Sequence, residues 1–284
     1  MFMYNIFIDT FTQNCWLTKV FMVQKHYNQL NNQVFFDTHH PPFLSIVVPV
    51  YNEASNLALL IQEINQTLDG QISYEIIYVD DGSRDESWEL LQSLVKQCSV
   101  LRIVRHRRSY GQSVAILTGV KLARAEWIVT LDGDGQNDPA DIWKLLEVLK
   151  VPQRPPRLHL IAGKRYKRQD TWIRRISSKI ANGLRSALLQ DNTSDTGCGL
   201  KLFSRKTFLA LPHFNHMHRF LPALFLREGS DILFVEVNHR PRQRGQSKYG
   251  VWNRLWKGLV DTLGVMWLQR RHCLAEIIEE LPKK

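Results

Sequence analysis

From residue 44 onward, the pattern of hydrophobic residues switches repeatedly between one typical of β-strands and one typical of α-helices. Short apolar runs rich in β-branched residues predict four strands, in the segments LSIVVPV, YEIIYV, LRIV and WIVTL. After each run, apolar residues recur three and four positions apart, which predicts helices such as the one over 112–123. Strands that alternate with helices of this length indicate an α/β fold, with a Rossmann-like, mostly parallel sheet and helices on both faces.

Two helices carry sequence signals for their first residues. Ser83, with Glu86 three residues later, predicts a capping box for the helix after the second strand. Asp138 followed by Pro139 predicts the start of the helix after the fourth strand.

The pattern divides the chain into three parts. Residues 1–42 have no clear period and end in HHPP, so we interpret them as an N-terminal extension. Residues 43–250 are expected to form one domain, with the strand–helix repeat in 43–150 and a looser, basic half in 151–250. Residues 251–284 begin with the amphipathic segment WNRLWKGLVDTLGVMWLQRR, which predicts a C-terminal helical segment.

Acidic residues directly follow three of the predicted strands, where ligands bind in an open parallel sheet. They are Glu53, Asp80, Asp81, Asp132 and Asp134. Five carboxylates at one edge repel one another unless a cation or a set of hydrogen-bond donors holds them together. One acid after a strand is as readily a helix cap, but five indicate a ligand site.

The segment LDGDGQ sharpens this expectation. Alternation places Asp132, Asp134 and the Gln136 carbonyl on one side, which suits a hard cation such as Mg²⁺ or Mn²⁺. These cations prefer one or two carboxylates plus substrate phosphates, so a nucleoside diphosphate is the expected partner. In isolation DGDG is as readily a surface turn, but its place at the end of a buried strand favours the cation site.

The amino-acid composition excludes some classes of protein and favours an anionic partner. Hydrophobic residues make up 44% and charged residues 23%, which excludes disordered and collagen-like chains. With 37 Lys and Arg against 27 Asp and Glu, the net charge of +10 favours an anionic partner. The four cysteines are far apart, which favours a reducing cytosol over a disulfide framework or a zinc cluster.

Several further classes are disfavoured. The sequence contains no GxGxxG and no GxxxxGK[ST], the motifs of dinucleotide oxidoreductases and P-loop nucleotidases. Its apolar windows are interrupted by a charge or a proline before the length of a membrane-spanning helix, so we expect no transmembrane helix and no signal peptide. Any membrane contact is then expected to be peripheral.

A basic stretch follows the strand–helix repeat. Eight cations between Lys164 and Arg185 stand beside one acid, Asp170. A helix would place Arg174 and Ser178 on one face, a suitable grip for a phosphate. The alternative is a solvated basic face.

Eight segments together resemble a known family. In order along the chain they are VVPVYNE (47–53), VDDGSRD (79–85), GQSVAILTG (111–119), LDGDGQNDP (131–139), GKRY (163–166), RRISSKIAN (174–182), DTGCGLKLF (195–203) and GQSKYG (245–250). They resemble the inverting family-2 glycosyltransferases of GT-A fold, and within them the dolichol- and polyprenyl-phosphate sugar transferases, such as dolichol-phosphate mannosyltransferase. The resemblance covers about 44–255. Ser109 departs from it, because relatives commonly have an asparagine there, and the C-terminal transmembrane helices of membrane-bound members have no counterpart.

The resemblance implies a role for each matching residue. Donor-binding residues are expected to be Pro49, Tyr51, Glu53, Asp80, Asp81, Gly111, Gln112, Asp132 and Lys164. Metal ligands are expected to be Asp132, Asp134 and Gln136, and catalytic residues Asp134, Arg165 and Asp195. The acceptor phosphate is expected at Arg174, Ser178, Arg242, Ser247 and Lys248.

These expectations define a hypothesis and its competitors. The hypothesis is metal-assisted transfer, with inversion, of a sugar from a UDP- or GDP-sugar to a polyprenyl phosphate. An ionised phosphate needs no general base. A saccharide or lipid hydroxyl acceptor remains open, with Asp195 as the candidate base. A nucleic-acid-binding module is less favoured, because strand-end carboxylates would repel a polyanion.

Two further features allow more than one interpretation. His213, His216 and His218 fall on different faces of a helix, so we favour core or loop roles over a metal site and expect the neighbouring Arg219 to line the site. The tryptophans and cations of residues 252–271 suit either a core helix or a helix lying on anionic lipid. The second interpretation predicts a cytoplasmic protein that is peripheral on the cytoplasmic face of the membrane.

Overall fold

The computed structural model describes most of the chain between residues 41 and 271. The described residues are 41–165, 183, 185–191, 193, 195–241 and 251–271, with side chains of the last segment described from 258.

The first half of the described chain alternates strands and helices. Its elements are β1 (Leu44–Val50), α2 (Ala54–Leu68), β2 (Tyr74–Asp80), α3 (Ser87–Leu94), β3 (Leu101–Arg105), α4 (Gln112–Leu122), β4 (Trp127–Thr130), η1 (Pro139–Asp141) and α5 (Ile142–Lys150). The four strands expected from the apolar runs are therefore confirmed.

The second half is less regular. Its elements are β5 (Leu158–Arg165), β6 (Lys201–Ser204), α7 (Arg205–Ala210), η2 (Met217–Arg219), α8 (Leu221–Arg227), β7 (Asp231–Val237) and α9 (Val251–Arg270). Most of the basic stretch between Lys164 and Arg185, where a helix would place Arg174 and Ser178 on one face, lies outside the described residues; residues 185–189 are helical. The predicted C-terminal helix is α9.

Within the described residues the strands form one seven-stranded sheet in the order β3-β2-β1-β4-β6-β5-β7. Strands β3, β2, β1 and β4 are parallel neighbours, whereas β6 is antiparallel to both β4 and β5. The chain therefore enters β6 beside the carboxyl end of β4. This reversal brings the segment before β6 to the edge where Asp132 follows β4.

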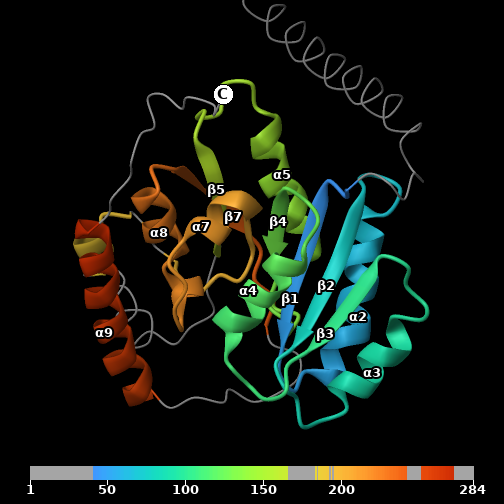
Figure 1. The fold of residues 1–284 in the computed structure, drawn as a ribbon. Coiled ribbons are helices and arrows are strands. Elements are labelled where there is room, and N and C mark those ends of the chain that lie inside the picture. Colours follow the sequence, from blue (N-terminus) through green and yellow to red (C-terminus); the bar gives the residue numbers. More distant parts are fainter. Residues whose placement is uncertain are drawn as a thin grey trace, which may run out of the picture.

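Helices cover both faces of the sheet, as the sequence predicts (Figure 1). In β1, Ile46, Val48 and Val50 pack into a core with α2, α3 and α5. Val47, on the other face, packs with α4, α7 and α8. Burial on both faces explains why the strand sequences are continuously apolar rather than alternating. Helix α4 approaches β1 so closely that a side chain at Gly119 would overlap Val47.

The two helix-start predictions have different outcomes. Asp138 accepts a hydrogen bond from the Ala140 backbone N–H at 3.1 Å and caps the η1 turn before α5, as predicted. The capping box at Ser83 is wrong, because α3 begins at Ser87 and its N–H donates to Asp85 at 3.1 Å. The Ser83 hydroxyl accepts instead from the Asn52 N–H at 2.9 Å and so ties the loop after β2 to the loop after β1.

Helix α9 packs beside α8 at the end of the sheet formed by β5 and β7 (Figure 1). Val265 of α9 is buried in the core, whereas Leu259, Val260, Leu263 and Trp267 are exposed. Within the described residues, we find no helix that combines the length and the apolarity needed to cross a bilayer.

Candidate functional site

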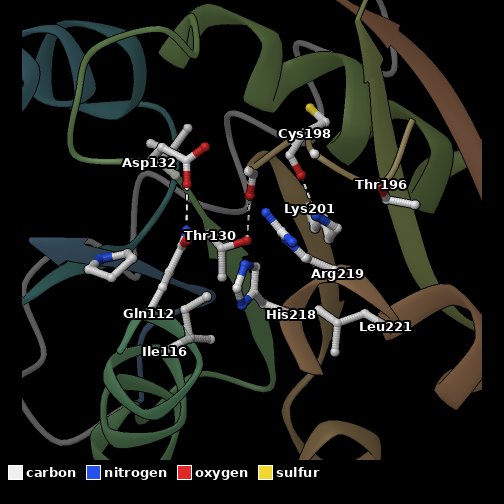
Figure 2. A pocket seen from close by; sticks show the side chains of 14 residues that line it. Gln112, Ile116, Thr130, Asp132, Thr196, Cys198, Lys201, His218, Arg219 and Leu221 are labelled. Carbon is white, nitrogen blue, oxygen red and sulfur yellow. Dashed lines mark hydrogen bonds between the residues drawn. The ribbon is translucent and has the colours of Figure 1, made fainter. Parts of the chain in front are cut away.

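A cavity of about 120 Å³ opens at the carboxyl ends of β1 and β4, between these strands, the start of α4, the segment before β6 and η2. We call it the central cavity and define it by Gln112, Thr130, Asp132, Lys201, His218 and Arg219 (Figure 2). It lies where the strand order reverses around β1, the position at which ligands bind in open α/β sheets. The cavity therefore lies at the carboxyl ends of the strands, where the sequence predicts a ligand site.

Asp132 forms one wall of the central cavity. Its carboxylate accepts a hydrogen bond from Gln112 Nε2 at 2.8 Å, and its backbone N–H donates to Asn137 Oδ1 at 3.0 Å. Gly199 lies against the carboxylate, where a side chain would overlap it. Burial, and then the charge of Asp134, raises the pKa of Asp132 to about 6. The raised pKa means that the protein destabilises the ionised form of Asp132, and a bound cation would stabilise that form.

The other two expected metal ligands lie in the same loop. The Asp134 carboxylate accepts the Gln136 N–H at 3.1 Å, while Gln136 Nε2 faces the Arg240 carbonyl oxygen at 3.4 Å. Asn137 pairs with His239 as an isolated bridge, so this loop is joined to the chain that follows β7. Among the described residues, no group of three or more His, Cys, Asp or Glu is arranged to hold a metal ion. A cation held here would rest on Asp132, Asp134 and oxygens of its ligand.

Asp81, expected to bind the donor, organises the loop before α4. Its carboxylate accepts hydrogen bonds from Ser109 Oγ at 2.7 Å and from the backbone N–H groups of Tyr110 at 2.9 Å and Gly111 at 2.8 Å. His106 Nδ1 lies 2.7 Å from the same carboxylate. These contacts fix the start of α4 and thereby the side chain of Gln112. Ser109, which departs from the family pattern, is one of the anchors.

Tyr51 lines a second hollow, and Asp80 contacts two residues of its lining. Asp80 accepts the Ser83 N–H at 3.1 Å and forms an ion pair with Arg105 at 3.1 Å. Glu53 accepts a hydrogen bond from Asn56 at 2.8 Å. The hollow, of about 640 Å³, is lined by Tyr51, by residues 82–84 and by residues 105–109. Its arginines make it suited to an anionic ligand.

Arg165 and Asp195, both expected to be catalytic, form a bidentate pair. Arg165 Nε and Nη2 each donate to the Asp195 carboxylate at 2.7 Å. Burial opposes the charge of Arg165, but the hydrogen bonds and charge of Asp195 outweigh it and raise the Arg165 pKa. A carboxylate held in this way is a weak proton acceptor, because the paired guanidinium favours its ionised form.

The other expected residues have different positions. Pro49 lines the central cavity, and Lys164 is exposed on β5. Gly111 precedes α4 with a φ of 96°. The expected acceptor residues lie outside the described residues; they are Arg174, Ser178, Arg242, Ser247 and Lys248.

Lys201 and His218 are among the cavity residues that sequence reasoning missed. Lys201 is 5% exposed at the start of β6, and its ammonium donates to the Cys198 carbonyl oxygen. His218 Nδ1 lies 2.7 Å from Ser113 Oγ, and burial, with the charges of Lys201 and Arg219, holds the His218 pKa well below its usual value. A lysine within the apolar segment LKLF was the available signal for Lys201. Arg219 lines the cavity as expected.

The sequence comparisons identify a family and two similar enzymes. Residues 45–211 match Glycosyl transferase family 2. The chain is 34% identical over 235 residues to dodecaprenyl-phosphate galacturonate synthase of Rhizobium johnstonii, covering 80% of this chain and 67% of that protein. It is 34% identical over 211 residues to undecaprenyl-phosphate 4-deoxy-4-formamido-L-arabinose transferase of Edwardsiella ictaluri, covering 74% and 63%. The chain thus spans about two thirds of the length of these relatives.

Solved structures share the fold. Glucosyl-3-phosphoglycerate synthase of Mycobacterium tuberculosis, in complex with Mg²⁺ and UDP, aligns with a TM-score of 0.61 at 16% identity, covering 87% of this chain and 83% of that one. The same enzyme with Mn²⁺, UDP and glucosyl-3-phosphoglycerate aligns with a TM-score of 0.59 at 17% identity, covering 80% of both chains. The arrangement is therefore the GT-A fold that the motifs predict. With a family match over more than half of its length, the chain belongs to glycosyltransferase family 2.

Proposed function

We propose that this chain transfers a sugar from a nucleoside-diphosphate sugar to a polyprenyl phosphate, with inversion at the anomeric carbon. The observation that carries the proposal is the raised pKa of Asp132, which lies close to Asp134 and lines the central cavity at the carboxyl ends of the strands. Both relatives named above are sugar transferases whose names specify a polyprenyl phosphate, which supports the acceptor. The sugars in those names differ, so they leave the donor sugar open.

The bond changes are simple in this reaction. An acceptor phosphate oxygen attacks the anomeric carbon and forms a new C–O bond, while the bond to the donor's β-phosphate oxygen breaks with its electron pair. The nucleoside diphosphate leaves. Because a phosphomonoester is largely ionised near pH 7, with a second pKa of about 6, no side chain must remove a proton. The pairing of Asp195 with Arg165 disfavours the alternative in which Asp195 activates a hydroxyl acceptor.

The residues then divide the work. Asp132 and Asp134 would hold Mg²⁺ or Mn²⁺, which neutralises the donor diphosphate when it is bound. Gln112 orients the Asp132 carboxylate, and the loop anchored on Asp81 borders the donor. Arg165 supplies fixed positive charge near the leaving group, kept in place by Asp195.

Helix α9 supports residence at a membrane surface, where a polyprenyl acceptor would be found. Its exposed Leu259, Val260, Leu263 and Trp267 form an apolar surface followed by the cations Arg270 and Arg271. Apolar side chains beside cations suit the headgroup region of anionic lipid. We propose that the protein lies peripherally on the cytoplasmic face of the membrane.

The test is a transfer assay with labelled UDP- and GDP-sugars and undecaprenyl phosphate in detergent micelles. We expect formation of a lipid-phosphate sugar from at least one donor, dependent on Mg²⁺ or Mn²⁺ and lost with EDTA. Asp134→Asn should lower the rate at least about 100-fold, whereas Asp69→Asn, at an exposed site after α2, should not change it. A folded protein that transfers no sugar to lipid phosphate under any of these conditions would refute the proposal.

A further inference from the structure

The central cavity is lined by two cationic side chains, Lys201 and Arg219. We infer that this cavity is the donor-sugar subsite and that Lys201 and Arg219 give it a preference for sugars bearing a carboxylate, the hexuronic acids. This inference rests on the function proposed above and specifies its substrate class.

The cavity has the size and position for a sugar ring. Its volume of about 120 Å³ is close to the roughly 150 Å³ of an engineered cavity that holds benzene, a six-membered ring. Asp132 stands at one side, so a diphosphate held near Asp132 would place the attached sugar within reach of the cavity. Gln112, Thr130 and Thr196 border the cavity with groups that hydrogen-bond to sugar hydroxyls.

Lys201 is the main reason to expect an anion. Its side chain is buried, and its ammonium donates to a neutral acceptor, the Cys198 carbonyl oxygen. Among the described residues no carboxylate lies within ion-pair distance of it. A buried ammonium without a paired anion is costly, and proteins usually supply a counter-charge at such a position. Because Lys201 lies in the wall of the cavity, an anion bound in the cavity could supply this counter-charge.

Arg219 adds a second positive charge from another element. Figure 2 shows its side chain extending from η2 into the cavity, on the side of Thr130 and Lys201. A guanidinium binds a carboxylate through two parallel N–H donors, a geometry that a neutral CH₂OH group cannot use. His218 lies beside both cations, and burial and their charges hold its pKa low, so it remains a neutral neighbour near pH 7.

Asp132 does not cancel this positive field when the site is loaded. Among the described residues that line the cavity it is the acidic one. Under the proposed function its charge is matched by the divalent cation that binds the donor diphosphate. The two cations on the opposite side then face the sugar.

Matched donors isolate the carboxylate. UDP-glucose and UDP-glucuronic acid differ only at C6, as do UDP-galactose and UDP-galacturonic acid, and GDP-mannose and GDP-mannuronic acid. We expect kcat/KM with undecaprenyl phosphate to be at least about tenfold higher for the acid in one of these pairs, the range of a charge-assisted hydrogen bond. Calorimetric titration of the same donors, with Mn²⁺ present, should show the same order of affinity.

Variants identify the source of the preference. Arg219→Gln and Lys201→Met should each lower kcat/KM for the uronic-acid donor roughly 10- to 100-fold and change it less than about threefold for the neutral partner. Arg219→Lys should restore part of the preference. Arg154→Gln, an exposed arginine before β5, is the matched control and should leave both donors unchanged. If Lys201→Met does not fold, the two Arg219 variants still decide the question.

Two results would overturn the inference. A wild-type protein that transfers or binds the neutral donors at least as well as the acids would show that the cavity does not select a carboxylate. Equal losses for both members of a pair in the Arg219 variants would assign that cation to a phosphate instead. Transfer of neutral sugars alone would leave the proposed function intact, whereas absence of transfer from every donor would refute that function itself. In that case the calorimetric order of the donors still tests the inference.

Discussion

Two buried carboxylates at opposite edges of the sheet have opposite properties. Glu75, near the amino ends of β1 and β2, accepts hydrogen bonds from Ser45 Oγ at 2.7 Å, Arg102 at 2.6 Å and the Arg124 N–H at 2.8 Å. Burial alone would raise the Glu75 pKa, but these donors outweigh it and lower the pKa. Asp132, at the carboxyl ends, has Gln112 as a donor and a pKa raised to about 6 by burial and Asp134.

Glu75 has the properties of a carboxylate that stabilises the fold, whereas Asp132 has those of a carboxylate that binds a ligand. At the amino edge every oxygen of the carboxylate meets donors from the protein, so the charge is complete without a ligand. At the carboxyl edge neither charge has an ion-pair partner among the described residues: Asp132 accepts from the neutral Gln112 amide and Lys201 donates to a carbonyl oxygen, and the two charges partly offset each other across the cavity. Residues of the first kind stabilise the fold, and residues of the second kind bind a ligand. The predictions below test this division.

The largest expected effect is on activity at Asp132. Under the proposed function, Asp132→Asn should reduce sugar transfer by about 1,000-fold or more, because it would remove a charge that holds the cation at the leaving diphosphate. Its thermal unfolding temperature in EDTA should equal or exceed that of the wild type, because a buried charge with few donors has been removed. Activity assays and calorimetric melting of the same preparation measure both. A marked drop in melting temperature would assign Asp132 a structural role.

Glu75→Gln should have the reverse profile. We expect it to lower the free energy of unfolding by about 2 kcal/mol, because a buried charge-assisted network is lost. The figure is below that of a fully buried pair, since the Arg102 and Arg124 side chains are 38% and 59% exposed and can be solvated. Urea unfolding measures the change, and kcat for the folded fraction at low temperature should be within about twofold of the wild type. A loss of kcat at full folding would break the comparison.

Asp81 should lie between these extremes, because it is a structural carboxylate at the functional edge. Asp81→Asn replaces an acceptor by an amide that cannot receive all the donors of the 106–111 loop. We expect the donor KM to rise about tenfold, a cost of about 1.4 kcal/mol, while kcat changes less. Steady-state kinetics over a range of donor concentrations separates the two constants. An unchanged KM would show that the loop does not position the donor.

The smallest effects are in the dependence of stability on pH, where the two edges should respond in opposite senses. The Glu75 pKa is lowered on folding, so its stabilisation is present above about 4.5 and is lost as the pH falls through the lowered value. The Asp132 pKa is raised, so in EDTA the folded protein takes up a proton near pH 6 and gains relative stability as the pH falls toward 4.

Urea unfolding between pH 3 and pH 8 tests these slopes in the wild type and in the Glu75→Gln and Asp132→Asn variants. Relative to the wild type, Glu75→Gln should be least harmful at the lowest pH. Asp132→Asn should be most favourable above pH 6. Parallel curves for all three proteins would show that neither carboxyl changes its pKa on folding.

Local patterns in the sequence are sufficient to predict the strands and helices of the first half of the domain and the acids that follow its strands. The apolar runs and the helical spacing are local patterns, so they predict β1 to β4 and the helices between them without knowledge of the fold. The acids of LDGDGQ follow a buried strand, and carboxyl ends of parallel strands meet at one edge, so the sequence predicts both acids at the edge where Asp132 lines the cavity. Helix caps were harder, because Ser83, Asp85 and Glu86 compete within four residues for the same start.

The cations that share the cavity with Asp132 depend on the tertiary fold. Strand β6 runs antiparallel to β4, and this register pairs Lys201 with Thr130 and so places Lys201 and Cys198 in the wall of the cavity that Asp132 also lines. Ser113 and His218 meet across 105 positions of sequence, and Arg165 and Asp195 across 30. No periodicity encodes such contacts, because they depend on strand order and on the path of the chain between elements. The hydrophobic pattern therefore specifies where the cavity lies, and the topology specifies the charges inside it.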